Sequence, residues 1–471
     1  MKKISTIIFS VIVSTQIFAQ CIKSIATGDY HSAMVLNDGT LWTWGKNNYG
    51  QLGDSTISNK NYPIRIGTDT TWVYVAAGYG YTMAIKENGT LWAWGKNQNG
   101  QLGNSTNTEQ HIPVQIGFDT DWKTLALGHS HTVAIKTNGV MWAWGNNLYG
   151  ALGDGTNTDQ NSPIQIGTDT NWKLIANDGR GTKAIKTNGT LWAWGENGFG
   201  QCGIGTNQNI SSPAQVGTDN NWTSVTNSLN CAMAVKADGS LWAWGFSTSM
   251  GLSGATPTQV GSDINWKSIS VGFNHSIATK TDSTLWAWGA NSLGQVGDST
   301  TNGVSSFVQI GTSANWSFVD CGYNFSSAIK SNRTFWLWGD NAAGEMGDST
   351  NTNKLIPTYL YSCLTPIDTT TNPTDTVNPI DTTQNNASVH DIDFNNNFKV
   401  YPNPVKSKLN VKSISTSIIQ SVTITDVIGN TVYRSNKGEN EINTSSLSKG
   451  IYTIQLVFEG STYSKKFIKN E

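Results

Sequence analysis

Few side chains of this sequence have the types and spacing that chemistry needs. Three of the six histidines stand at one position of a repeated phrase: His31, His131 and His275. Other copies place Tyr, Gly, Cys or Phe there, so we expect the position to support the fold, for example by bonding a loop carbonyl. No serine-hydrolase elbow, zinc-protease helix or cysteine pair with metal spacing occurs. The sequence therefore predicts no catalytic and no cofactor-binding residues, and a protein that is not an enzyme.

One acidic segment has the composition of a cation loop. GDGTNTDQ from Gly153 offers several carboxylate and hydroxyl oxygens. It lacks the glutamate and the spacing of a hand-type calcium loop, and turns closed by Asn and Asp side chains explain it better. We therefore predict no metal site.

Tryptophan marks the elements that position the rest of the chain. The phrase W-x-W-G begins at seven places: Trp42, Trp92, Trp142, Trp192, Trp242, Trp286 and Trp336. A single Trp follows Asn, Asp or Thr at six more: Trp72, Trp122, Trp172, Trp222, Trp266 and Trp316. These account for all 20 Trp, and G-Q-L-G or a close variant of it follows every copy but the one at Gly245, whose unit is shorter. The tryptophans are thus expected to be packing residues between repeats.

Each repeat reads as four short strands. In one copy they begin at Trp122, His131, Val140 and Pro163. The second and third are joined by Asn-Gly or Asp-Gly in five copies, a pair that accepts positive φ at both turn positions. The sixth and seventh copies carry Asp282-Ser283 and Asn332-Arg333, which predicts less ideal turns. The expected fold is all-β: a seven-bladed β-propeller, followed by a linker and a small C-terminal β-sandwich.

Positions that differ between copies are the best candidates for binding, because shared positions build the ring. The tight loop after each first strand carries different residues in turn, several of them aromatic: Tyr79, His129, Phe273 and Tyr323. We predict that these four form a binding rim. If they are exposed, replacing them should barely change stability; if they are buried between blades, each replacement should cost about 3–5 kcal/mol. Tyr49, Tyr149, Phe199 and Leu293, after W-x-W-G, are expected to pack under their own loops.

The motifs carry a family resemblance. G-x-x-H at Gly28–His31, Gly128–His131 and Gly272–His275, then W-x-W-G, then G-Q-L-G, resembles the regulator of chromosome condensation repeat over about residues 22–361. That resemblance implies a seven-bladed propeller. The family's namesake is a nuclear exchange factor that binds a small GTPase and chromatin. Secreted relatives include propeller inhibitors of β-lactamase that bind proteins with one face. The family thus makes protein binding plausible and names no target.

The charge of the chain bears on the partners that it can bind. Charged residues are 13% of the chain, the formal net charge is −2 and no basic run appears, so nucleic-acid binding is not expected.

Aligning the repeats puts Cys21 and Cys363 on either side of the turn that is cut at ring closure. We predict a disulfide between them, with two unpaired cysteines as the alternative. Cys202, Cys231 and Cys321 fall at unrelated positions and are expected to be buried thiols.

The two ends of the chain predict export. Residues 1–19 read as a signal peptide, and residues 20–363 as the propeller. Residues 364–394 read as a Thr/Asn/Asp/Pro-rich linker, in which three D-T-T or D-T-V phrases resemble a bacterial O-glycosylation sequon. In residues 395–471, Y-P-N-P at Tyr401–Pro404, D-V-I-G-N at Asp426–Asn430 and the final K-K-F-I-K resemble the type IX secretion C-terminal sorting domain. That resemblance implies export across an outer membrane, then release or attachment to the cell surface; an adhesive β-sandwich is the alternative.

The function that fits these observations is recognition. We expect a secreted or cell-surface binding propeller that takes a protein or glycan, for adhesion or inhibition, and contacts the secretion machinery through residues 395–471. No nucleic-acid partner and no integral membrane segment are expected. A secreted enzyme with a site at the propeller axis, or a structural surface-layer component, remains an alternative.

Overall fold

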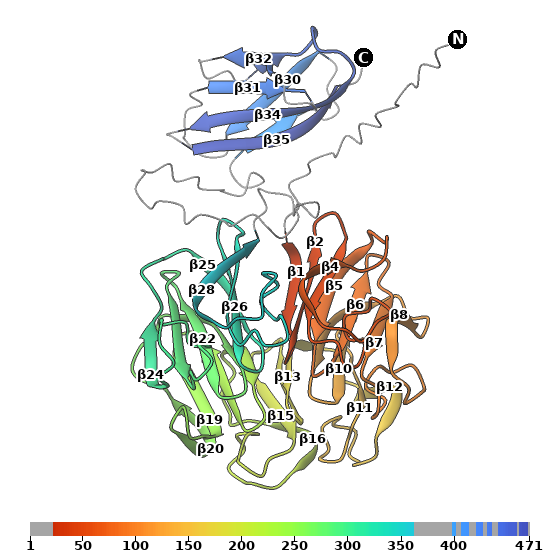
Figure 1. Cartoon of the computed structure of the whole chain (residues 1–471), viewed down its shortest axis with the longest axis vertical. Coiled ribbons are helices and arrows are strands. Elements are labelled where there is room, and N and C mark those ends of the chain that lie inside the picture. The colour runs from red at the N-terminus through yellow and green to blue at the C-terminus, as the bar shows by residue number, and fades with distance from the viewer. Residues whose placement is uncertain are drawn as a thin grey trace, which may run out of the picture. The chain divides into compact units, whose positions relative to one another are not determined.

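The computed structural model describes residues 22–361 of a first compact unit and six short ranges of a second. The ranges in the second unit are 398–401, 407–413, 421–426, 431–435, 441–458 and 461–469. The two units divide at residues 368 and 369 (Figure 1). The expected signal peptide, the linker, Cys21 and Cys363 all lie outside the described residues. None of the described residues form a helix long and apolar enough to cross a membrane.

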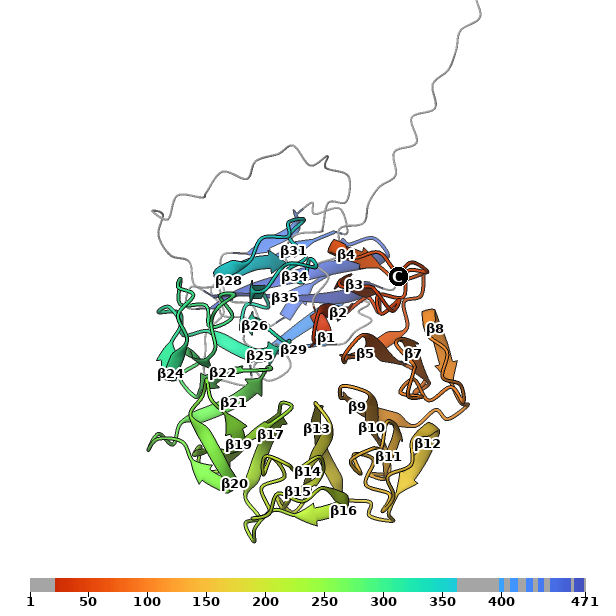
Figure 2. The same cartoon turned by 60° about the horizontal axis from the view of Figure 1, so that its bottom comes forward.

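The first unit is a ring of seven four-stranded antiparallel sheets, which confirms the expected seven blades. Blade 1 contains β1 (Ile22–Thr27), β2 (His31–Leu36), β3 (Leu41–Gly45) and β4 (Lys60–Arg65). Blade 2 contains β5 (Trp72–Ala77), β6 (Tyr81–Lys86), β7 (Leu91–Gly95) and β8 (Gln110–Ile116). Blade 3 contains β9 (Trp122–Leu127), β10 (His131–Lys136), β11 (Met141–Gly145) and β12 (Gln160–Ile166). Blades 4 and 5 are β13 (Trp172–Asp178), β14 (Gly181–Lys186), β15 (Leu191–Gly195), β16 (Ile210–Gln215); and β17 (Trp222–Asn227), β18 (Cys231–Lys236), β19 (Leu241–Ser247), β20 (Leu252–Gln259). Blades 6 and 7 are β21 (Trp266–Val271), β22 (His275–Lys280), β23 (Leu285–Gly289), β24 (Val304–Gln309); and β25 (Trp316–Cys321), β26 (Phe325–Lys330), β27 (Phe335–Gly339), β28 (Lys354–Tyr361). Figure 2 shows the first strand of each blade facing the axis.

The turns between second and third strands differ in detail from the expectation. Only the glycine has positive φ, as at Gly39 (77°), because its N–H closes a turn on Leu36 O while Asp38 Oδ1 accepts from Thr40 N. The hairpin turns are present as expected, but only their second position uses positive φ. In the sixth and seventh copies Ser283 (63°) and Arg333 (62°) adopt the same left-handed conformation. A side chain is disfavoured there, so these two turns are the strained ones, as expected.

The tryptophans join the blades, as expected. In W-x-W the second ring is buried, and in six blades its indole N–H donates to a backbone oxygen in the loop of the preceding blade, as Trp144 Nε1 does to Gln101 O at 2.9 Å. That oxygen also accepts from a second-strand hydroxyl, Thr132 Oγ1, at 2.9 Å. The G-Q-L-G loop thus supplies the acceptor that bonds one blade to the next.

The junction between blades 5 and 6 lacks this acceptor. The loop after Gly245 is the shortened one, and among the described residues the buried indole N–H of Trp288 has no hydrogen-bond partner. Ser276 Oγ, at the Thr132 position, reaches only the sulfur of Met250 at 3.5 Å. Apolar packing remains, since Phe307 lies 5.0 Å from the Trp288 ring. This junction is therefore held by fewer polar contacts than its neighbours.

Ring closure brings blade 7 against blade 1. Blades 2 to 6 each place a lysine ammonium over two tryptophan rings and beside an aspartate, as Lys136 does with Trp122, Trp142 and Asp119 (2.7 Å). Blade 7 keeps its lysine and rings but has Ser313 in place of the acid. In blade 1, Leu36 stands at the position of the lysine and Ile22 at the position of the single tryptophan. Both pack with Tyr361 of β28 in one apolar cluster. The last strand therefore lies against the first blade, as expected.

The second unit is a small β-sandwich, again as expected. One sheet contains β29 (Phe398–Tyr401), β30 (Lys408–Ser413) and β33 (Glu441–Asn443). The other contains β31 (Ser421–Thr425), β32 (Thr431–Ser435), β34 (Gly450–Phe458) and β35 (Ser461–Lys469). Side chains from both sheets form its core: Leu409, Val411, Val422, Ile424, Ile442, Tyr452, Ile454 and Leu456.

Candidate binding rim around the propeller axis

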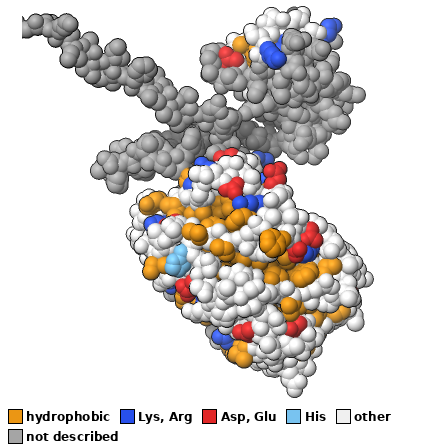
Figure 3. Space-filling view, turned by 90° about the vertical axis from the view of Figure 1, so that its right-hand side faces the viewer, with side chains coloured by type: hydrophobic (Ala, Val, Ile, Leu, Met, Phe, Trp, Pro, Cys, Tyr) orange, Lys and Arg blue, Asp and Glu red, His pale blue; other side chains and the backbone are white. Residues whose placement is uncertain are grey.

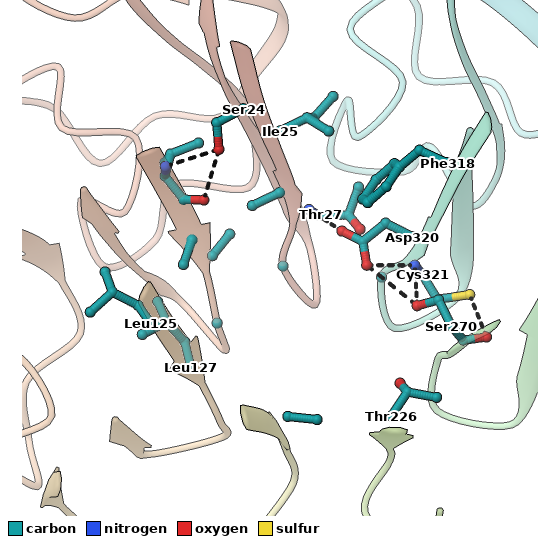
Figure 4. A pocket seen from close by; sticks show the side chains of 18 of the residues that line it. Ser24, Ile25, Thr27, Leu125, Leu127, Thr226, Ser270, Phe318, Asp320 and Cys321 are labelled. Atoms are coloured by element: carbon teal, nitrogen blue, oxygen red, sulfur yellow. Dashed lines mark hydrogen bonds between the residues drawn. The ribbon is translucent and has the colours of Figure 1, made fainter. Parts of the chain in front are cut away.

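The propeller axis holds a cavity of about 620 Å³ lined by the first strands of the blades (Figure 4). One carboxylate, Asp320, stands where the other copies have Ala, Thr or Ser. It accepts from Thr27 N (2.9 Å), Ser270 Oγ (3.3 Å) and Cys321 N (3.1 Å), and burial raises its pKa. Burial, then the charge of Asp320, also raises the pKa of the Cys321 thiol, so the nucleophilic thiolate is disfavoured. The polar groups of the cavity wall thus bond one another across blades.

One end of this cavity is bordered by the tight loops between the first and second strands. In the first blade Gly28 N donates to His31 O, leaving two residues, Asp29 and Tyr30, at the tip. A Cβ on Gly28 would lie 2.7 Å from Gly78 O of the next blade, so neighbouring loops are in close contact. Backbone bonds link some loops directly, as Tyr323 N does with Asp29 O at 3.1 Å. The loops therefore hold their tip residues in a fixed arrangement.

Five tip residues form a continuous series of ring contacts, which we call the aromatic arc: Phe273, Tyr323, Tyr30, Tyr79 and His129. Phe273 and Tyr323 stack with centroids 4.3 Å apart, and Tyr79 and His129 stack at 4.1 Å. Tyr30 joins the two pairs, at 5.1 Å from Tyr323 and 6.0 Å from Tyr79. The structure thus brings together all four sequence-predicted rim residues, and adds Tyr30.

The arc residues are half-buried, which lies between the two outcomes expected for them. Each ring covers part of its neighbour and leaves the remainder open. Blades 4 and 5 have Gly179 and Leu229 at the repeat position of Tyr79, which interrupts the series of aromatic rings. At its centre is a cavity of only 10 Å³, bordered by Asp29, His129 and Leu229 among others. That volume is about one water molecule, so the loops nearly close this end of the axis.

Basic side chains surround the arc. Lys46 Nζ lies 4.4 Å from the Tyr30 ring centroid, and Lys96 Nζ lies 4.4 Å from that of Tyr79. Burial, then the charges of Lys96 and Arg180, lowers the pKa of His129 to about 4. Burial raises the pKa of Asp29 to about 7, and Lys96 opposes that rise. At neutral pH, His129 is therefore neutral, Lys96 and Arg180 carry positive charges near it, and Asp29 is close to its own pKa and partly ionised.

Sequence reasoning missed these cations. Lys46 and Lys96 directly follow W-x-W-G, a position where the other copies carry Asn, Glu, Phe, Ala and Asp. That variation is the same signal that identified the tip residues. The expectation that Tyr49 and Tyr149 pack under their own loops was also wrong. Tyr49 lies 5.5 Å from Lys96 Nζ, and Tyr149 lies 5.4 Å from the Arg180 guanidinium, both in the next blade.

The repeated histidines are structural, but their partner differs from the expectation. His31 Nε2 lies 2.7 Å from Thr82 Oγ1, and the equivalent bonds of His131 and His275 also reach a hydroxyl of the next blade. No loop carbonyl is involved in these three contacts. Burial lowers the pKa of His31 and His131 to about 3 and that of His275 to about 4. In the described ranges no group of three or more His, Cys, Asp or Glu is placed to hold a metal ion.

Comparisons with known families agree with this architecture. Residues 8–254, more than half of the chain, match the RCC1-like domain, and residues 266–295 match the regulator of chromosome condensation (RCC1) repeat. Residues 399–470 match the secretion system C-terminal sorting domain.

Curated relatives match over a small part of their length. The mitochondrial RCC1 domain-containing protein RUG3 of Arabidopsis thaliana is 36% identical over 66 residues, which is 14% of this chain and 15% of that protein. The X-linked retinitis pigmentosa GTPase regulator homolog of Caenorhabditis elegans is 37% identical over 67 residues, 14% of this chain and 5% of that protein.

Solved structures share the fold. Prp20p of Saccharomyces cerevisiae, studied for its binding to Gsp1p and histones, is 23% identical with a TM-score of 0.58, covering 65% of this chain and 82% of that one. Human WBSCR16 is 19% identical with a TM-score of 0.62, covering 68% of this chain and 94% of that one. At these identities the likeness concerns the fold alone.

Proposed function

Because this chain belongs to the RCC1-like domain family and ends in a secretion system sorting domain, we propose that it is an exported, non-catalytic binding protein. In this proposal the aromatic arc recognises a protein or glycan outside the cell. The protein ends up released or attached at the outer surface, and residues 395–471 contact the secretion machinery.

The observation that carries the proposal is the arc itself. Five half-buried rings contact one another in series at the loop tips, and four of them occupy one repeat position whose residue differs from copy to copy. Rigid aromatic side chains give a large contact area at a small loss of conformational entropy on binding. Figure 3 shows that hydrophobic side chains also reach the surface on one side of the ring, so the arc's location, rather than exposure alone, makes it the candidate.

The alternative of an enzyme at the axis has less support. Two carboxyl groups, Asp29 and Asp320, and one thiol, Cys321, line the axial cavity; Asp320 and Cys321 are engaged in bonds between blades. Neither is paired there with a base or an acid that would activate it. A structural surface-layer role would leave the differences between the arc residues without a purpose.

Binding is tested with the full chain on a glycan array and against surface-protein fractions. A ligand that recognises the arc should lose at least about tenfold in affinity when Tyr30 and Tyr323 are both replaced by Ala. The matched control is Phe118→Ala, because Phe118 is 95% exposed in the turn at the other end of β9. Equal binding by wild type and the arc variant, with loss in the Phe118 variant, would remove the assignment.

Export is tested separately by deleting residues 395–471. The truncated protein should stay inside the cell and remain soluble, because the propeller has its own core. Normal appearance of the truncated protein in the medium would contradict the sorting role. A propeller that aggregates on truncation would show instead that the second unit supports folding.

A further inference from the structure

A second pocket, which we call the cationic pocket, lies beside the aromatic arc. Its volume is about 240 Å³, and loops of blades 2, 3 and 4 line it. The polar and aromatic side chains available to a ligand in this pocket include Lys96, Asn99, His129, Asn146, Tyr149 and Arg180. No Asp or Glu is among the lining residues. A pocket of this size is smaller than a typical drug-sized site and suits one sugar ring or one side chain.

Lys96 is the unusual residue of this pocket. It is only 7% exposed, and among the described residues its ammonium has neither a hydrogen bond nor an ion pair within 4 Å. The faces of Tyr79 and Tyr49 hold it instead. Burial lowers the pKa of Lys96, while the more distant Asp29 and Glu109 oppose that effect. The side chain as a whole is buried, yet its ammonium still reaches the space of the pocket, where it is open to a negatively charged group from outside the chain.

Arg180 supplies a second cation. Among the described residues it has one ion pair, with Glu196 at 3.7 Å, which leaves guanidinium N–H donors available. The lowered pKa of His129 reports both cations, since Lys96 and Arg180 each act on that ring. Lys96 and Arg180 are thus the fixed charges among the residues that line the pocket, while Glu196 pairs with Arg180 and Asp159 accepts from its two asparagines. Asn99 and Asn146 each donate once, at 3.5 and 3.3 Å, to Asp159, and retain further donor and acceptor capacity.

We propose that the cationic pocket binds a carboxylate-bearing sugar, a uronic acid residue of an acidic polysaccharide. The carboxylate faces Lys96 and Arg180, and the sugar hydroxyls meet the amides of Asn99 and Asn146. An acidic peptide side chain would satisfy the cations, but it lacks the hydroxyls that can bond the remaining donors and acceptors of these half-exposed amides. This inference rests on the proposed binding function and names the ligand class for one sector of the rim.

The test uses the full chain and calorimetry with oligosaccharides of galacturonic, glucuronic and mannuronic acid. At least one acidic oligomer should bind, and its methyl ester should not, because esterification removes the charge and keeps the sugar. A tetraglutamate peptide should bind weakly or not at all. If no acidic oligomer binds, if the esters bind equally, or if the peptide binds more tightly, the proposal is wrong.

Variants separate charge from folding. Lys96→Met keeps the chain length and a favourable contact with the tyrosines, so it should fold while losing about tenfold or more in affinity for the acidic oligomer. Arg180→Gln should also lose affinity. The control is Lys173→Met, because Lys173 is exposed at the far end of β13, in the same blade as Arg180. An unchanged affinity in Lys96→Met, with an unchanged melting temperature, overturns the assignment.

A spectroscopic readout is independent of affinity. A bound carboxylate should raise the pKa of His129 from about 4, because a negative charge stabilises the imidazolium form. Histidine resonances followed over pH, with and without the acidic oligomer, measure that shift. An unchanged His129 pKa in the saturated protein contradicts the proposal. Binding through the arc could survive all of these failures, since its test uses Tyr30 and Tyr323 instead.

Discussion

The indole Nε1 of Trp94 donates a 2.9 Å hydrogen bond to Gln51 O, which lies in the preceding blade. Trp288 occupies the same repeat position with no such partner among the described residues. Replacing Trp94 by Phe should therefore destabilise the ring by about 1–3 kcal/mol more than replacing Trp288 by Phe, since only the former breaks a buried bond. Denaturant unfolding of the two variants measures the difference. Equal losses of unfolding free energy in the two variants would mean that only the volume of the indole side chain, and not its hydrogen bond, contributes to stability at these junctions.

Val140→Thr should stabilise the propeller. Six of the seven blades have Thr or Ser at this position, and its hydroxyl accepts from the first Trp of W-x-W, as Thr90 Oγ1 does from Trp92 at 3.1 Å. In blade 3 Val140 leaves the Trp142 indole N–H without a partner among the described residues. Restoring the bond should raise the free energy of unfolding by about 1 kcal/mol. A thermal melt measures it, with Thr90→Val as the opposite change.

Glu345→Gln should change how stability depends on pH. Glu345 replaces the Gln of G-Q-L-G at the closing junction and is 1% exposed, and burial raises its pKa from 4.5 to about 7. The folded protein thus holds a proton that the unfolded chain has lost, so this contribution to stability falls as pH rises from about 4.5 to 7. The variant should lack that decline.

The measurement is the difference in unfolding free energy between wild type and Glu345→Gln at pH 4.5, 6 and 8. Taking the difference cancels other titrating groups, including Asp29, whose pKa is also raised to about 7. The variant should gain stability relative to wild type as pH rises. A difference that is constant with pH would contradict the assignment.

Tyr323→Ala should cost about 1–2 kcal/mol of stability. Tyr323 stacks on both Phe273 and Tyr30 but is half-buried, so its loss should be smaller than that of a fully buried aromatic residue. Phe325→Ala, in the adjacent strand and 1% exposed, should cost about 3–5 kcal/mol and serves as the comparison. Similar losses in both variants would assign Tyr323 to the core and weaken the case for a binding arc.

The sequence predicted the ring because its information is periodic. Trp pairs, turn glycines and strand lengths recur at the same positions of each repeat. Each of these features determines contacts within one blade or between neighbouring blades. The stacking of Tyr79 on His129 could be expected only as a shared repeat position, since the distance between neighbouring loops depends on the completed ring. Lys96 and Arg180 meet in one pocket for the same reason, across three blades. The Cys21–Cys363 disulfide stays a prediction.

The closing junction differs from the others in the length of chain that it spans. The bond between Thr27 N and Asp320 Oδ2 joins residues 293 positions apart, whereas the hydrogen bonds of Trp94 and Trp144 to the preceding blade span 43. Bringing distant segments together loses more chain entropy, so neighbouring blades can associate before the ring closes. Closure should then be the last step of folding, and opening between blades 7 and 1 the first step of unfolding. Its buried Glu345 makes that step sensitive to protons in a way that the glutamine-bearing junctions are not.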